Sequence, residues 1–156
     1  MDGVRIHGRA DRIDRLPDGT LAVVDYKTGT PPSARMVEEG FALQLGLVGL
    51  IAQGGGIRGV SGTPTRFEYW SLARNRERGF GFMDEPVLEG RRKSGLPREE
   101  FLDRTREYLD EAIARWILGS DPFTARENPN LPGYTDYDQL MRLDEWFGKG
   151  RTGIDA

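Results

Sequence analysis

The sequence contains no cysteine and a single histidine, His7. Without thiols the chain cannot form disulfides, zinc ribbons or iron–sulfur clusters, so no Fe–S cluster is expected. The formal net charge is −3, so binding to nucleic acid would have to rely on local arginine clusters. No apolar run is long enough to span a bilayer and no signal-like segment opens the chain. We therefore expect no membrane partner and, most simply, a cytoplasmic protein.

The length of 156 residues, of which 37% are hydrophobic, suits one domain with a modest core. We predict a single domain over residues 1–156, with a sheet and a first helix in residues 3–73 and a helical C-terminal part in residues 97–156. Met1 leads directly into a strand-like sequence. This start suits a compact protein that begins with a strand or a piece of a longer chain, and we favour the second interpretation.

Two strands joined by a tight turn are predicted near the N-terminus. Residues Val4 to Leu16 alternate apolar and polar side chains, which is typical of a strand, and His7 is expected to be an ordinary residue of it. Pro17-Asp18-Gly19 has the composition of a turn. The run from Thr20 to Lys27 should therefore pair back on the first strand as a hairpin.

A helix and a third strand follow. Ser33 is placed to cap a helix that runs to about Gln53, where three glycines end it. Glycines within this helix weaken it but permit close packing. Alternation predicts a strand over residues 65–73, while residues 74–96 have the weak periodicity of an exposed excursion. A helix between two strands allows the third strand to run parallel to the second.

The C-terminal third is predicted to be helical. An amphipathic pattern indicates a helix over residues 97–118, and a short helix from Tyr137 to Phe147 should close the structure. The order strand–strand–helix–strand–helix predicts the α/β class, with a mixed central sheet flanked by helices.

A charged pair lies where the apolar run of the second strand ends. Asp25 and Lys27 are separated by one residue, so on a strand they lie on the same side, about 6–7 Å apart along the backbone. Asp11 lies across the hairpin. Two carboxylates and the Tyr26 carbonyl would suffice as protein ligands for Mg²⁺, and Lys27 could orient a water or neutralise a phosphate. An ordinary surface Asp–Lys pair is an equally open interpretation.

Three segments occur in order: Gly8-Arg9-Ala10-Asp11-Arg12-Ile13-Asp14, then Val23-Val24-Asp25-Tyr26-Lys27-Thr28-Gly29, then Leu43-Gln44-Leu45. Together they resemble the PD-(D/E)xK nuclease superfamily. They are similar in particular to the RecB/AddB-type nuclease domain at the C-terminus of bacterial helicase–nuclease proteins. The resemblance covers roughly residues 3–50 and implies a restriction-endonuclease-like core.

The resemblance implies roles for four side chains. Asp11 and Asp25 would be metal ligands for Mg²⁺, with Mn²⁺ as a possible substitute. Lys27 would be the catalytic lysine, and Gln44 would support the site or contact DNA. The implied activity is that of a helicase-associated deoxyribonuclease of the exonuclease type. Its substrate would be DNA, in single strands delivered by a helicase subunit or domain, during double-strand break repair and recombination.

The chain departs from the family pattern in two places. Members carry a helix before the first strand, which this sequence lacks, and many carry an aromatic residue where this chain has Val48. These departures favour a second hypothesis, a catalytically incomplete structural or DNA-binding module that keeps the nuclease fold. An unrelated small α/β protein with a chance Asp-x-Lys is the third. The segments Asp121-Pro122-Phe123 and Tyr137-Asp138 resemble the tail of AddB-type proteins.

Basic residues gather in the region expected to be an excursion. We expect them to track a phosphate backbone, although a solvated arginine-rich loop is an equally open interpretation. The candidate DNA-binding residues are Arg74, Arg76, Arg91, Arg92 and Lys93, and Arg78 and Arg98 belong to the same basic surplus. The three tryptophans are expected in packing positions rather than as platforms for bases. Asp14 is expected to be an exposed, solvated acid; the alternatives are an assistant to the metal site and a contact with Arg12 or Arg15.

Overall fold

The computed structural model describes residues 3–76 and 79–122. The chain divides into two compact units, residues 1–119 and 120–156, and the first contains every element discussed below. The helix predicted from Tyr137 to Phe147, the Tyr137-Asp138 segment, Arg78, Phe123 and Trp146 lie outside the described residues. None of the described helices is long and apolar enough to cross a membrane.

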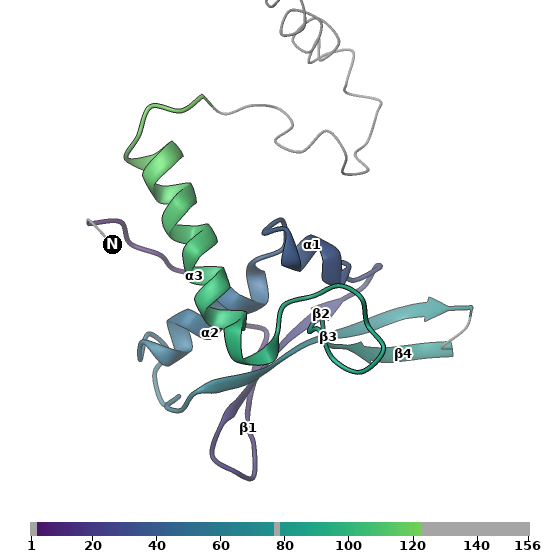
Figure 1. Ribbon diagram of the computed structural model, residues 1–156. Coiled ribbons are helices and arrows are strands. Elements are labelled where there is room, and N and C mark those ends of the chain that lie inside the picture. The colour runs from purple at the N-terminus through teal and green to yellow at the C-terminus, as the bar shows by residue number, and fades with distance from the viewer. Residues whose placement is uncertain (1–2, 77–78, 123–156) are drawn as a thin grey trace, which may run out of the picture. The chain divides into compact units, whose positions relative to one another are not determined.

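A four-stranded mixed sheet forms the framework (Figure 1). Its strands are β1 (Arg12–Arg15), β2 (Leu21–Lys27), β3 (Pro64–Asn75) and β4 (Gly79–Asp84), and they lie in that order. β2 pairs antiparallel with β1 and parallel with β3, while β3 and β4 are antiparallel. The mixed sheet and the parallel third strand confirm the predicted α/β class.

The predicted hairpin between the first two strands is confirmed, but its first strand is shorter than expected. Gly19 takes a positive φ of 84° in the turn, and the Leu16 N–H donates to the Thr20 carbonyl at 2.8 Å. Only Arg12–Arg15 pair with β2, so the prediction of a strand from Val4 was wrong for its N-terminal part. The Tyr26 N–H donates to the Asp11 carboxylate at 3.0 Å. The Asp11 side chain therefore occupies the Tyr26 N–H, which would have bonded to a backbone carbonyl if the pairing of β1 with β2 had continued.

The helix predicted from Ser33 to Gln53 is two helices. α1 spans Ala34–Glu38 and α2 spans Gln44–Gln53. Ser33 caps α1 as expected, since its hydroxyl accepts from the Met36 N–H at 3.2 Å. Gly40, at φ 79°, interrupts the helix because this left-handed conformation cannot continue it. The break makes Gln44 the first residue of a new helix.

The C-terminal helix is confirmed and has three sections. η1 spans Arg98–Glu100, α3 spans Phe101–Ala112, and a π-helical turn, η2, spans Ile113–Ile117. The region expected to be an excursion contains the strand β4, which was not predicted from the sequence. β4 consists of GFGFMD, and its two glycines hide the alternation that marks a strand.

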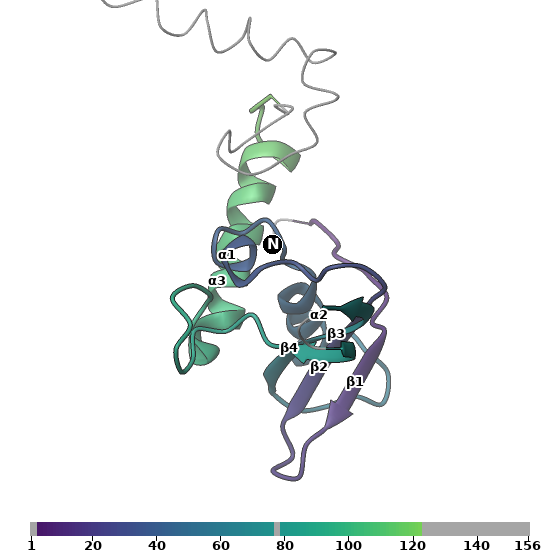
Figure 2. The ribbon, with the colours of Figure 1, turned by 90° about the vertical axis from the view of Figure 1, so that its right-hand side faces the viewer.

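The core lies between the sheet and the helices, with α2 and α3 on the same side of β2 and β3 (Figures 1 and 2). Phe67 of β3 stacks on Phe101 of α3 with the ring centroids 4.0 Å apart. The buried cluster also contains Val23, Val37, Leu45, Tyr69, Val87 and Leu96. Burying each large apolar side chain contributes about 1.5–3 kcal/mol, so this cluster holds α2 and α3 against the sheet.

Candidate active site

Three polar side chains form a closed set of contacts where β2 ends and α2 begins. The Lys27 Nζ lies 2.8 Å from Asp25 Oδ2 and donates to Gln44 Oε1 at 2.9 Å. The Gln44 Nε2 donates to Asp25 Oδ1 at 2.6 Å. Asp25 and Lys27 lie on one face of β2, as their spacing predicted, and the break after α1 brings Gln44 to the same place. The structure thus brings together three of the four predicted catalytic residues.

Burial makes this contact set unusual for an acid and a lysine. The Asp25 residue is only 5% exposed, and the Lys27 side chain is 26% exposed. A buried carboxylate is costly unless it is paired. Asp25 Oδ1 is satisfied by Gln44, whereas Oδ2 accepts no hydrogen bond of good geometry and is balanced by the nearby ammonium charge alone. The interpretation as an ordinary surface pair therefore does not apply.

Tyr69 borders the same site and was not singled out from the sequence. It is the register partner of Asp25 on β3, and its ring centroid lies 5.5 Å from the Lys27 Nζ. Its hydroxyl is buried without a hydrogen-bond partner. Burial raises the pKa of this hydroxyl, and the charges of Asp25 and Asp84 raise it further. Its alternation with Phe67 on the predicted third strand was the one feature of the sequence that could have placed Tyr69 on the buried face.

Asp11, the fourth predicted residue, approaches β2 from the hairpin side. It is exposed, and its Oδ2 accepts from the Tyr26 N–H at 3.0 Å. The contact fixes this carboxylate beside the residue that separates Asp25 from Lys27. Asp11 joins no hydrogen bond or ion pair with these two residues in the described part of the chain.

The model of the PD-(D/E)XK nuclease superfamily matches residues 1–134. The chain belongs to this superfamily. Comparison with curated proteins and with solved structures found no match. Members usually hydrolyse the phosphodiester bonds of nucleic acids and generally use divalent metals such as Mg²⁺. The four-stranded sheet with flanking helices is consistent with the restriction-endonuclease-like fold of the superfamily.

The oxygen ligands of this domain suit a hard cation that takes few ligands from the protein. Mg²⁺ is commonly bound by one or two carboxylates and keeps several waters. Asp25 Oδ2 is a buried oxygen without a directed hydrogen bond, which is the kind of lone pair that a cation takes up. No group of three or more His, Asp or Glu residues suited to a metal occurs among the described residues. Water would therefore complete the coordination.

The opposite face of the sheet carries a second aromatic and basic cluster. Arg12 lies over the Trp70 ring at 4.7 Å, and the rings of Trp70 and Tyr26 meet edge to face at 5.8 Å. This contact places Trp70 in a packing position, as expected. Asp14 accepts from the Arg12 Nε at 2.8 Å, which is the contact held as an alternative to a solvated acid. Arg12 and Asp14 are two residues apart on β1 and therefore lie on the same face of the strand, where their side chains are in contact.

The predicted DNA-binding residues of the nuclease domain fall into two groups. Arg74 and Arg76 are exposed at the end of β3, whereas Arg91 and Lys93 are exposed in the loop after β4. Arg92 is committed to an ion pair with Asp84. The structure thus separates the five residues into a group beside the sheet and a group on a loop.

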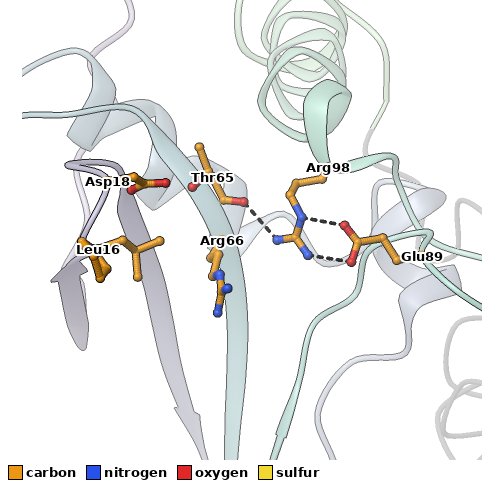
Figure 3. A pocket seen from close by; sticks show the side chains of 7 residues that line it. Leu16, Asp18, Thr65, Arg66, Glu89 and Arg98 are labelled. Carbon is orange, nitrogen blue, oxygen red and sulfur yellow. Dashed lines mark hydrogen bonds and ion pairs between the residues drawn. The ribbon is translucent and has the colours of Figure 1, made fainter.

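An open hollow of about 700 Å³ lies near the β1–β2 turn (Figure 3). Its most connected side chain is Arg98, which donates to Glu85, Glu89 and the Thr65 carbonyl. The pairing with these carboxylates raises the pKa of Arg98 and lowers that of Glu89. Because the Arg98 donors are already occupied, Arg98 acts here as a structural junction and not as the anion contact that a basic residue on a loop suggested.

Proposed function

We propose that this domain is a metal-dependent deoxyribonuclease whose active site consists of Asp11, Asp25, Lys27 and Gln44. The observation that carries the proposal is the buried contact set of Asp25, Lys27 and Gln44 in a member of a nuclease superfamily. An ion pair at this depth is expensive to maintain for stability alone. The contact set also holds the Asp25 carboxylate where it can bind a cation and the Lys27 ammonium where it can bind a phosphate.

Each residue has a distinct part in the proposed reaction. Asp11, Asp25 and the Tyr26 carbonyl would hold Mg²⁺, or Mn²⁺ in its place. Bound there, the ion would supply Lewis-acid stabilisation of the phosphate and a lowered pKa for an attacking water. Lys27 directs its ammonium toward the incoming phosphate and hydrogen-bonds the water. Gln44 is a positioning residue, since it holds both Asp25 and Lys27.

The resemblance to RecB/AddB-type nuclease domains supports a narrower form of the proposal. The domain would act with a helicase subunit or domain that delivers single strands, as an exonuclease in double-strand break repair and recombination. The exposed group of Arg74 and Arg76 would contact the phosphate backbone there, together with Arg91 and Lys93, whereas Arg92 is held by Asp84.

The test is cleavage of a labelled oligonucleotide by the full chain in Mg²⁺. Asp25→Ala and Lys27→Ala should each lower the rate by at least a hundredfold, because each removes a group that touches the reacting atoms. Asp103→Ala is the matched control, since Asp103 is an exposed acid on α3 far along the chain from the site. Full activity in both site variants would refute the assignment.

A second candidate is the catalytically incomplete DNA-binding module. The observation in its favour is that no three-acid metal group occurs among the described residues. Calorimetric titration with Mn²⁺ separates the two candidates. A nuclease should bind the ion and lose binding in Asp11→Ala and Asp25→Ala, whereas an incomplete module should bind DNA but take up no ion at these residues.

A further inference from the structure

Phe80 is the most exposed of the large hydrophobic residues in the described part of the chain, at 76%. A single exposed apolar side chain needs no explanation. The position of Phe80 is nevertheless informative, because this residue lies on β4 directly opposite Arg74 of β3. Beyond the end of β2, these two strands continue as a two-stranded ribbon (Figure 1).

The register places Phe80 on the strand that carries a register partner of the proposed active site, two residues from it. Lys27, Ser71 and Phe82 are register partners across β2, β3 and β4, and partners in a sheet share a face. Phe80 precedes Phe82 by two residues, with Gly81 at a φ of 74° between them. From strand spacings of ~4.8 Å and a rise of ~3.3 Å per residue, Phe80 lies on the order of 12 Å from Lys27. A few nucleotides of an extended strand cover that span.

The backbone around Phe80 leaves the ring accessible. Gly79 and Gly81, on either side of it, both have a φ of 74°. A Cβ added to Gly79 would meet nothing within 4 Å, and one added to Gly81 would meet only the Ser71 carbonyl oxygen at 4.0 Å. The register also shifts between Ser71 and Arg74. Glycines and bulges in strands occur where a ligand approaches the backbone closely or a side chain is re-aimed near an active site.

We propose that the β3–β4 ribbon is a binding element for single-stranded nucleic acid, with Phe80 as a platform on which a base stacks. Arg74, exposed and without an ion pair among the described residues, contacts the adjacent phosphate. An aromatic face beside a cation matches a nucleotide, which has a base and a negative charge. This inference rests on the proposed nuclease function and adds the element that would hold its single strands, since only unpaired bases are free to stack.

The experiment measures binding of a fluorescent single-stranded oligonucleotide to the full chain by anisotropy, in EDTA so that no strand is cut. Stacking on an aromatic side chain is sequence-tolerant, and its loss should weaken binding by about 5- to 100-fold in Phe80→Ala. Phe80→Tyr should retain the affinity because it keeps the ring. Met83→Ala is the matched control, since Met83 is 64% exposed on the same strand but pairs with Trp70 on the opposite face.

Further readouts separate the possible outcomes. Binding to duplex DNA should be the same in Phe80→Ala as in the unchanged chain, and in cleavage assays the KM for single strands should rise while kcat stays constant. Normal single-strand binding by Phe80→Ala, or an equal loss in Met83→Ala, would overturn the inference and favour a protein partner for the ribbon. If Asp25→Ala is still inactive in that case, the proposed nuclease function stands. A chain that neither binds nor cuts DNA would refute both.

Discussion

At the scale of single residues, the site concentrates unsatisfied polar groups in one place. Asp25 Oδ2 and the Tyr69 hydroxyl are both buried without a directed hydrogen bond, and the two residues are register partners on neighbouring strands. The Asp25 oxygen is balanced by the Lys27 ammonium at 2.8 Å, whereas the Tyr69 hydroxyl has no partner, which costs about 1–3 kcal/mol. Such costs are found at functional sites, where the polar groups are needed for function and not for stability.

The Tyr69 hydroxyl gives a prediction about stability. Tyr69→Phe should raise the free energy of unfolding by about 1 kcal/mol, because it removes a buried oxygen that has no partner. Tyr108→Phe is the matched control and should lower it by about 1 kcal/mol, since the Tyr108 hydroxyl donates to the Glu38 carbonyl. Urea unfolding measures both. A loss of stability in Tyr69→Phe would mean that its hydroxyl has a partner in solution.

The raised pKa of Tyr69 also predicts a dependence on pH. The folded state favours the neutral phenol, so this group's contribution is fully present below its ordinary pKa of 10.0 and is lost as the pH rises above that value. The unchanged chain should therefore lose up to about 1.4 kcal/mol per pH unit more than Tyr69→Phe above pH ~10. Parallel unfolding curves of the two proteins over this range would contradict the prediction.

At the scale of elements, the close approach of α2 and α3 determines where the site can form. α2 begins with Gln44, and two residues later Gly46 faces Thr105 of α3 so closely that an added Cβ would lie 2.0 Å from its Oγ1. Glycine is required there because only a residue without a Cβ permits this spacing. The packing sets the position of α2, and therefore the reach of Gln44 to Asp25.

Gly46→Ala should lower the free energy of unfolding by about 1–3 kcal/mol through overpacking, despite the better helix propensity of alanine. It should also lower nuclease activity, because α2 must move away from α3. The double variant Gly46→Ala, Thr105→Ala should regain part of the stability. Gly29→Ala is the control and should be neutral, since a Cβ there meets nothing within 4 Å. Equal stabilities of Gly46→Ala and Gly29→Ala would contradict the account.

At the scale of the whole unit, Arg98 joins segments that are distant in the sequence. It donates to Glu85 after β4, to Glu89 in the following loop and to the Thr65 carbonyl of β3 (Figure 3). Charge-assisted, bidentate contacts of this kind are the stronger hydrogen bonds in proteins. They hold the start of the C-terminal helix against the sheet.

Arg98→Ala should therefore lower the free energy of unfolding by about 2 kcal/mol, measured in urea. Arg98→Lys should recover little of it, because an ammonium group cannot reproduce the forked contacts. The control, Arg104→Ala, removes an exposed pair with Glu107 on one helix and should change stability by less than about 0.5 kcal/mol. Similar decreases in the free energy of unfolding of Arg98→Ala and Arg104→Ala would show that the Arg98 contacts stabilise the fold no more than an exposed ion pair does.

Much of the fold was predictable because its signals are local. The turn at Gly19, the cap at Ser33 and the apolar run before Asp25 depend on neighbouring residues alone, and each is where the sequence places it. The misses have non-local causes. β4 exists because β3 offers it a partner, although its glycines give no alternation, and β1 is short because the Asp11 side chain occupies a backbone donor of β2.

The superfamily, and the charged side chains at the end of β2, could be recognised from the amino-acid sequence, because a period of two places Asp25 and Lys27 on one face of any strand. The depth at which that pair is buried, the contacts of Gln44 with both members and the place of Tyr69 beside them follow from the packing of the elements. The reason is physical: burial and pairing between elements depend on how α2, α3 and the sheet pack. No stretch of local sequence contains that arrangement.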